Sequence, residues 1–189
     1  MVDRSILVVD CGSEKVDSIQ RIVTELGFQP DRVRLGDVSK ASHAGYSGVI
    51  VSGSPILLTE TAPSKYLRVL RFTASVRCPT LGICFGHQVI GLLHGAKVFR
   101  GTECRVNQSV EVLDGNGLFE GLGARLSLRE DHCEGITLPP QFRLLATSVS
   151  YRVEAMKHRD KALYGVQFHP EASGAVGVRI LENFLRLCK

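Results

Sequence analysis

A cysteine flanked by two glycines, at the end of a short apolar run, constrains this chain more than any other feature. The run from 79 to 88 reads PTLGICFGHQ, with Cys84 midway between Gly82 and Gly86. In its serine form, G-x-S-x-G, this spacing places a nucleophile on a strained turn between a strand and a helix, where larger flanking side chains would collide with neighbouring segments. The pattern therefore predicts a strand, a tight turn at Cys84 and a helix from Gly86 to about His94.

The predicted turn would also activate the cysteine. A residue at the start of a helix lies beside unpaired backbone N–H groups and the positive end of the helix dipole, and both favour a thiolate over a thiol. The G-x-C-x-G pattern is short and also occurs by chance. Cys84 therefore needs a second group nearby before it can be identified as a nucleophile.

A second segment, at 164–171, supplies a candidate base and an acid to orient it. It reads YGVQFHPE, an apolar strand that runs into His169, Pro170 and Glu171. In an extended segment residues i and i+2 face the same way, and proline fixes the φ between them, so Glu171 can turn back on the imidazole. Taken singly, His169 could be a satisfied histidine at a strand end and Glu171 a solvated loop acid. Together with Cys84 they give a nucleophile, a base and an orienting carboxylate.

Both segments resemble the two signature motifs of class I (triad-type) glutamine amidotransferases, and the resemblance covers essentially the whole chain. Within that family the chain is most similar to the separate glutaminase subunit of archaeal-type GMP synthetases. The supporting stretches are GAKV at 95–98, VEAMKH at 153–158 and ILENF at 180–184. The resemblance implies that Cys84, His169 and Glu171 form a catalytic triad, which hydrolyses the side-chain amide of glutamine through a cysteine thioester.

The resemblance also implies roles for residues around the triad. Backbone N–H groups of Phe85 and of the loop at Gly53 and Ser54 would form an oxyanion hole. Gln88, one helical turn after the nucleophile, would contact the bound glutamine. Asp131 and His132 would lie next to the glutamine site, near the interface with a synthetase subunit.

Three positions depart from the family pattern: Ser13, Ser54 and Asp131. Ser13 and Glu14 replace a glycine and a glutamine, and Asp131 begins Asp-His-Cys-Glu where GMP synthetases show Ser-His-x-Asp. At 54 the family has glycine, which adopts positive φ freely, whereas serine loses roughly 1 kcal/mol or more. We expect the active loop to need positive φ here, so that Ser54 weakens the hole in the free chain until a partner corrects it.

The implied reaction releases ammonia, and the chain shows no P-loop-like stretch that would bind ATP. By resemblance, a separate ATP-pyrophosphatase subunit uses ATP and Mg²⁺ to activate XMP and aminates it to GMP, while this chain needs no metal or cofactor. Three alternatives stay open: the glutaminase subunit of an anthranilate or aminodeoxychorismate synthase, a stand-alone γ-glutamyl peptidase, and a catalytically silent regulatory module. The intact triad argues against silence.

Composition and charge set the remaining limits. The 189 residues are 44% hydrophobic, without repeats or linkers, which predicts a single domain over 1–189. The net charge of +4 is scattered and does not indicate nucleic-acid binding, and no apolar run approaches the ~18 residues of a membrane span. Six cysteines without C-x-x-C spacing or a signal peptide favour reduced thiols in a cytoplasm. A metal site at His132 and Cys133 lacks a second pair of ligands.

Hydrophobic periodicity predicts an α/β fold with a flavodoxin-like, mostly parallel sheet and helices on both faces. Active residues of such sheets lie at the carboxyl ends of the strands. In the first half, strands are expected at 5–10, 29–35, 48–52 and before Cys84, and helices at 14–26, with Ser13 as N-cap, and at 63–75. In the second half, short antiparallel additions are expected at 97–100, 108–113, 125–129, 142–147, 153–157 and 162–168, then a helix at 174–187.

Overall fold

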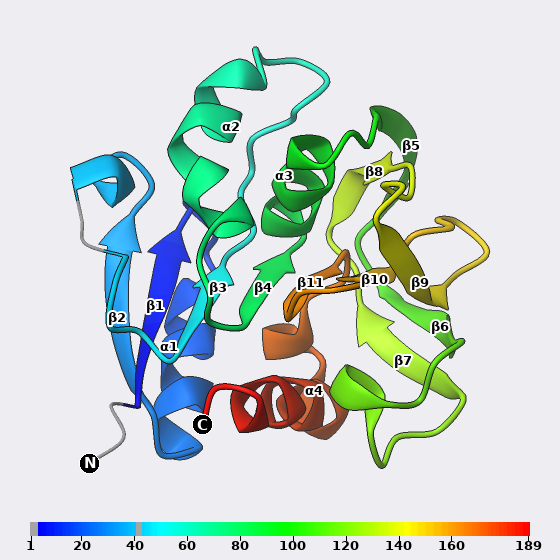
Figure 1. The fold of residues 1–189 in the computed structure, drawn as a ribbon. Helices are drawn as coiled ribbons and strands as arrows, with labels where there is room; N and C mark the ends of the chain where they lie inside the picture. Colours follow the sequence, from blue (N-terminus) through cyan, green and yellow to red (C-terminus); the bar gives the residue numbers. More distant parts are fainter. Residues whose placement is uncertain (1–3, 41–42) are drawn as a thin grey trace.

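The computed structural model describes residues 4–40 and 43–189, and its centre is a nine-stranded sheet (Figure 1). The strand order is β2-β1-β3-β4-β11-β10-β9-β6-β7, and the first five strands run parallel. This parallel part has the strand order of flavodoxin-like folds, which confirms the predicted fold class. Its strands are β2 (Gln29–Arg34), β1 (Ser5–Asp10), β3 (Gly48–Val51), β4 (Thr80–Ile83) and β11 (Leu163–Val166).

The parallel strands are almost continuously apolar because helices cover both faces of the sheet. Successive side chains of a strand point to opposite faces. In β1, Ile6 and Val8 belong to the core beneath α1 and α4, whereas Leu7 and Val9 belong to the core beneath α2 and α3 (Figure 1). The helices are α1 (Val16–Glu25), α4 (Gly174–Arg186), α2 (Ser64–Leu70) and α3 (Phe85–Leu93).

The second half of the chain widens the sheet with antiparallel strands and adds a small second sheet. The widening strands are β10 (Ala155–His158), β9 (Phe142–Thr147), β6 (Asn107–Val112) and β7 (Arg125–Arg129). The second sheet consists of β5 (Val98–Cys104) and β8 (His132–Ile136), which pair antiparallel and lie next to α3 (Figure 1).

Two strands differ from the sequence-based prediction. The segment at 162–168 is expected to be an antiparallel addition, but β11 runs parallel beside β4 and is antiparallel only to β10. The strand β8 is not predicted at all, because its sequence, HCEGI, carries polar residues at positions that turn out to be buried.

The helix boundaries also differ in two places. Lys15, not Ser13, is the N-cap of α1, and the Ser13 hydroxyl accepts a hydrogen bond from the Lys15 N–H (3.1 Å) in the turn before the helix. The helix predicted at 63–75 is α-helical only to Leu70 and continues as a 3-10 turn at Arg71–Ala74.

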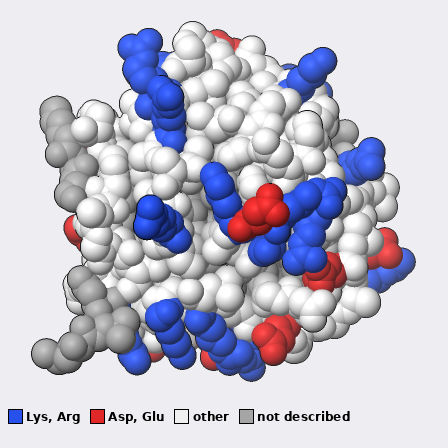
Figure 2. Space-filling view, viewed as in Figure 1, with Lys and Arg blue, Asp and Glu red and all other residues white. Residues whose placement is uncertain are grey.

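On the face shown in Figure 2, Lys and Arg side chains stand in separate groups with acidic side chains among them, and they form no continuous basic band. This distribution agrees with the scattered charge of the sequence. Within the residues that the structure describes, none of the helices has the length and apolar character needed to cross a bilayer.

Candidate active site

Cys84 lies on the turn between β4 and α3, as the glycine spacing predicts. With φ of 51° and ψ of −105°, it is the one non-glycine residue with positive φ in 4–40 and 43–189. This conformation costs of order 1–3 kcal/mol and persists only where the surroundings enforce it. Two backbone hydrogen bonds do so: the Cys84 N–H donates to the Val166 carbonyl (2.8 Å), and the Cys84 carbonyl accepts from the Gln88 N–H (3.0 Å).

The flanking glycines are needed because backbone atoms of other segments touch them. A Cβ on Gly82 would lie 2.5 Å from the carbonyl carbon of Gly86. A Cβ on Gly86 would lie 2.4 Å from the carbonyl oxygen of Val51 in β3. Such contacts cannot be relieved by a side-chain rotation, so any larger residue would displace β3 or α3. The turn at Cys84 therefore depends on both glycines.

His169 and Glu171 lie just past the end of β11, the neighbour of β4 in the sheet. Nδ1 of His169 is 2.8 Å from Oε1 of Glu171. A carboxylate oxygen accepts, so Nδ1 carries the hydrogen and Nε2 is left for Cys84. The contact forms through a 3-10 turn at Pro170–Ala172, which corrects the extended geometry expected for this segment.

The charges of the triad favour an ion pair. Burial lowers the pKa of His169, but hydrogen bonds to Cys84 and Glu171 and the negative charges of both outweigh it and raise this pKa to about 10. The imidazole is then protonated at neutral pH. The resting site accordingly holds an imidazolium beside a cysteine thiolate, the reactive form of cysteine.

A pocket of about 400 Å³ opens over Cys84. Loops at the carboxyl ends of β1, β3, β4 and β11 form one side of it, and β5 and β8 with their flanking residues form the other. Six of the predicted site residues line it: Ser54, Cys84, Gln88, Asp131, His132 and His169. Its volume is in the range of small-molecule sites.

The residues predicted for the oxyanion hole flank Cys84. Phe85 follows it directly, and Gly53 approaches so closely that a Cβ there would lie 2.9 Å from Cε1 of His169. Ser54 does not have positive φ, and its hydroxyl accepts from the Ile56 N–H (3.2 Å). This corrects the expectation of a left-handed conformation at Ser54. The oxyanion hole itself stays a prediction.

Asp131 ties together two sides of the pocket. Its carboxylate pairs with Lys15 Nζ (2.6 Å), from the loop after β1, and with Arg105 Nη1 (2.9 Å), from the turn after β5. Burial raises the pKa of Asp131, but the charges of Lys15, His169 and Arg105 outweigh burial and leave this pKa below its usual value. Asp131 is therefore ionised at neutral pH.

Gln88 and His132 reach the pocket but are held by the protein. The Glu134 carbonyl accepts from Nε2 of Gln88 (3.1 Å) and from Nδ1 of His132 (2.8 Å). The Glu134 carboxylate accepts from the backbone N–H groups of Leu58 and Thr59, at 2.8 and 2.7 Å. Glu134 thus connects β8 both to the helix behind Cys84 and to the loop that follows Ser54.

The chain matches the sequence model of the family described as "Glutamine amidotransferase class-I" over residues 7–188. It belongs to this family. It is 35% identical to a GMP synthase (glutamine-hydrolyzing) subunit of Pyrococcus furiosus, over 97% of this chain and 98% of that protein, and 37% identical to the protein of the same name from Pyrococcus abyssi, with the same coverage. The crystal structure of a putative GMP synthase subunit from Thermoplasma acidophilum superposes with a TM-score of 0.88 and 30% identity, covering 97% of this chain and 93% of that one.

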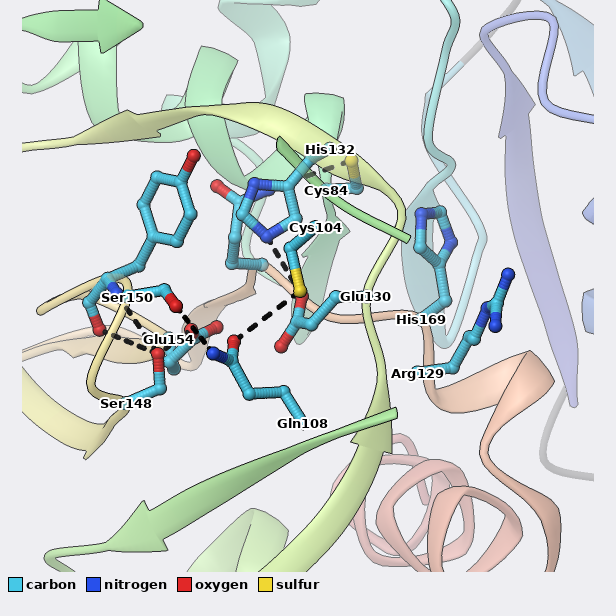
Figure 3. A network of polar contacts seen from close by, with 12 residues as sticks. Cys84, Cys104, Gln108, Arg129, Glu130, His132, Ser148, Ser150, Glu154 and His169 are labelled. Atoms are coloured by element: carbon cyan, nitrogen blue, oxygen red, sulfur yellow. Dashed lines mark hydrogen bonds and ion pairs between the residues drawn. The ribbon is translucent and has the colours of Figure 1, made fainter. Parts of the chain in front are cut away.

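This amidotransferase also has a buried carboxyl pair behind His132 (Figure 3). Ligand atoms of Glu130, His132 and Glu154 lie within 4.8 Å of one another, a spacing that suits a metal ion. The sequence argument that His132 lacks further ligands is therefore wrong, although the expectation that no metal is needed stays a prediction. Burial and the charge of Glu130 raise the pKa of Glu154 to about 9, so the pair holds a proton at neutral pH.

Sequence reasoning missed three buried residues near the nucleophile: Gln167, Glu130 and Glu154. Nε2 of Gln167 lies 3.6 Å from the Cys84 sulfur. One signal was available for it, because a polar residue within an apolar strand, two positions before His169, is expected on the same side as His169. Glu130 and Glu154 carried no such signal, since their partners come from other strands.

Proposed function

We propose that this chain hydrolyses the side-chain amide of glutamine to glutamate and ammonia. The observation that carries this proposal is the placement of the Cys84 thiolate on a strained turn, paired with the His169 imidazolium at the floor of a pocket of about 400 Å³. Membership of the class I glutamine amidotransferases supports the same chemistry.

In the proposed first half-reaction, the Cys84 thiolate attacks the carboxamide carbon and the C=O electron pair moves onto oxygen. Backbone N–H groups of Phe85 and of the loop at Gly53 and Ser54 hold this oxyanion, and such donors are typically worth ~3 kcal/mol each. His169 then gives its proton to the amide nitrogen. The C–N bond breaks, ammonia leaves, and a γ-glutamyl thioester remains on Cys84.

In the second half-reaction, the now neutral His169 takes a proton from a water molecule, which attacks the thioester carbon. The C–S bond breaks, glutamate leaves, and Cys84 returns to its thiolate form beside the imidazolium. Glu171 keeps the ring in the tautomer that both steps need. Every step uses groups of this chain, so we propose no cofactor for it.

We further propose that the ammonia passes to a separate synthetase subunit, which uses ATP and Mg²⁺ to aminate XMP to GMP. The names of the relatives and their match along almost the full length of this chain support this assignment. Residues 131–134 line the glutamine pocket and also hold its surrounding loops, so a partner that contacts them would act on the pocket. We expect the free chain to be slow and the complex to be fast.

The test is a glutaminase assay of the purified chain, alone and with a candidate synthetase subunit plus ATP and XMP. Glutamate release should increase in the full mixture, and GMP should form. Cys84→Ala is the control, because its complex should lose glutamine-dependent synthesis and keep ammonia-dependent synthesis. Equal glutamate release with and without the partner would favour a stand-alone hydrolase or peptidase. Glutamate release without GMP would favour another acceptor, and no glutamate in any mixture would refute the glutaminase.

A further inference from the structure

Cys84 has a second polar neighbour, which the mechanism above does not use. Nε2 of Gln167 lies 3.6 Å from Sγ of Cys84. Both residues are buried, at 0% and 5% exposure. Gln167 follows β11 and precedes His169 by two positions, so the same segment of chain supplies both groups that meet the sulfur. A fully buried amide beside a nucleophile requires that each end has a partner.

The surrounding contacts fix which end of the Gln167 amide faces the sulfur. Nε2 of Gln88 donates to the Glu134 carbonyl (3.1 Å) and to Oε1 of Gln167 (3.2 Å). A backbone carbonyl only accepts, so Gln88 must turn its NH₂ group in this direction. Gln167 must then present its oxygen to Gln88. Its NH₂ group is left facing Cys84.

This orientation favours one charge state of the sulfur. A thiol is a weak acceptor, whereas a thiolate accepts a charge-assisted hydrogen bond. The opposite arrangement occurs at Cys104, whose thiol donates to Oε1 of Gln108 (3.7 Å), as Figure 3 shows. Only a thiol can make that contact, and burial raises the pKa of Cys104. The two cysteine–glutamine pairs therefore present opposite ends of the amide to sulfur.

We propose that Gln167 is a further catalytic residue, which holds the Cys84 thiolate by donating an amide hydrogen to Sγ. Gln88 and the Glu134 carbonyl keep its amide turned the right way. The proposal rests on the proposed function, in which this thiolate attacks glutamine. The charged groups around the contact are His169 on one side of the sulfur, with Glu171 behind it and Asp131 nearby. A neutral donor adds a second contact to the thiolate and leaves this balance of charge unchanged.

The pH dependence of Cys84 alkylation tests the contact without glutamine. Iodoacetamide reacts with the thiolate, and peptide mass spectrometry between pH 5 and 9 separates Cys84 from the other cysteines. Gln167→Met keeps the length and bulk of the side chain but removes the N–H. We expect it to slow alkylation of Cys84 roughly fivefold to tenfold at pH 7 and to move the profile to higher pH by about half a unit to one unit. Gln108→Met is the matched control and should leave the Cys84 profile unchanged.

Glutaminase kinetics give a second readout. Gln167→Met should lower kcat by a similar factor and change KM little, because the donor acts on the nucleophile. An unchanged Cys84 alkylation profile in folded Gln167→Met would overturn the proposal. If that variant does not fold, Gln88→Met releases the amide and tests the same contact, and an unchanged profile there also overturns it. Because alkylation needs no glutamine, a wild-type chain without glutaminase activity would refute the proposed function and leave this result readable.

Discussion

Replacing Glu154 by glutamine should weaken the dependence of folding stability on pH. Glu154 is fully buried beside Glu130, and the Ser148 hydroxyl lies 2.6 Å from its Oε1. Burial and the charge of Glu130 raise the pKa of Glu154 from 4.5 to about 9. The folded chain therefore keeps a proton that the unfolded chain releases. Glutamine has nearly the same shape and supplies permanent N–H donors in place of that proton.

The sign of the effect follows from proton linkage. A group whose pKa is raised by folding contributes stability that is complete below its unfolded pKa and is lost as the pH rises through its folded pKa. Between pH 4.5 and 9 the folded chain binds more protons at this site, so the free energy of unfolding falls by at most ~1.4 kcal/mol per pH unit. From about pH 5.5 to 7.5 the wild type would lose up to ~2.7 kcal/mol relative to Glu154→Gln, or roughly 5–10 °C in Tm.

Urea unfolding followed by circular dichroism, at several pH values and under reducing conditions, measures these free energies. Other groups with shifted pKa values, His169 among them, titrate in both proteins, so the difference between the two curves isolates Glu154. Glu111→Gln, at an exposed position of β6, is the matched control and should follow the wild type. Parallel curves for the wild type and Glu154→Gln would show that Glu154 holds no proton. EDTA should leave the wild-type curve unchanged, because a proton and not a metal ion stabilises the carboxyl pair.

The triad and its surroundings give three further predictions. Cys84→Ala should abolish glutamate release while Cys133→Ala, at the pocket wall, keeps most of it; the reverse pattern would move the nucleophile. His169→Ala should cost several orders of magnitude in kcat and Glu171→Ala distinctly less, since one transfers protons and the other orients; equal small losses would indicate a structural His-Pro-Glu. Ser54→Gly should change kcat less than ~10-fold in the free chain and in the complex alike, because Ser54 has no positive φ to relieve; a selective gain in the free chain would restore the strain argument.

The nucleophile could be predicted from the sequence because its requirements are local. The spacing of Gly82, Cys84 and Gly86 encodes the turn directly, since each glycine avoids a backbone atom less than 3 Å from where a Cβ would be. The first strand was equally readable, because a strand covered on both faces is apolar at every position. The meeting of Cys84 with His169 followed from the resemblance. Its structural cause, the pairing of β4 with β11, did not.

The features that could not be predicted depend on contacts between distant segments. β8 buries Glu134, and a polar residue at a buried position hides the apolar alternation that marks a strand. Its carboxylate is tolerated there because Leu58 and Thr59 donate backbone N–H groups to it. The parallel pairing of β11 was hidden for a similar reason, since a short apolar run carries no information about its neighbour in the sheet.

The aspartate at 131 shows how a departure from the family pattern can be compensated. A carboxylate at this place would repel both the thiolate and the α-carboxylate of glutamine. Here Lys15 and Arg105 neutralise it, and they come from opposite sides of the pocket. The side chains of Asp131 and Lys15 remain 22% and 25% exposed, so their ion pair is worth only ~0–1 kcal/mol. The link is therefore weak enough to open when glutamine enters or a partner docks, whereas an uncharged serine at 131 would make no such ion pairs across the pocket.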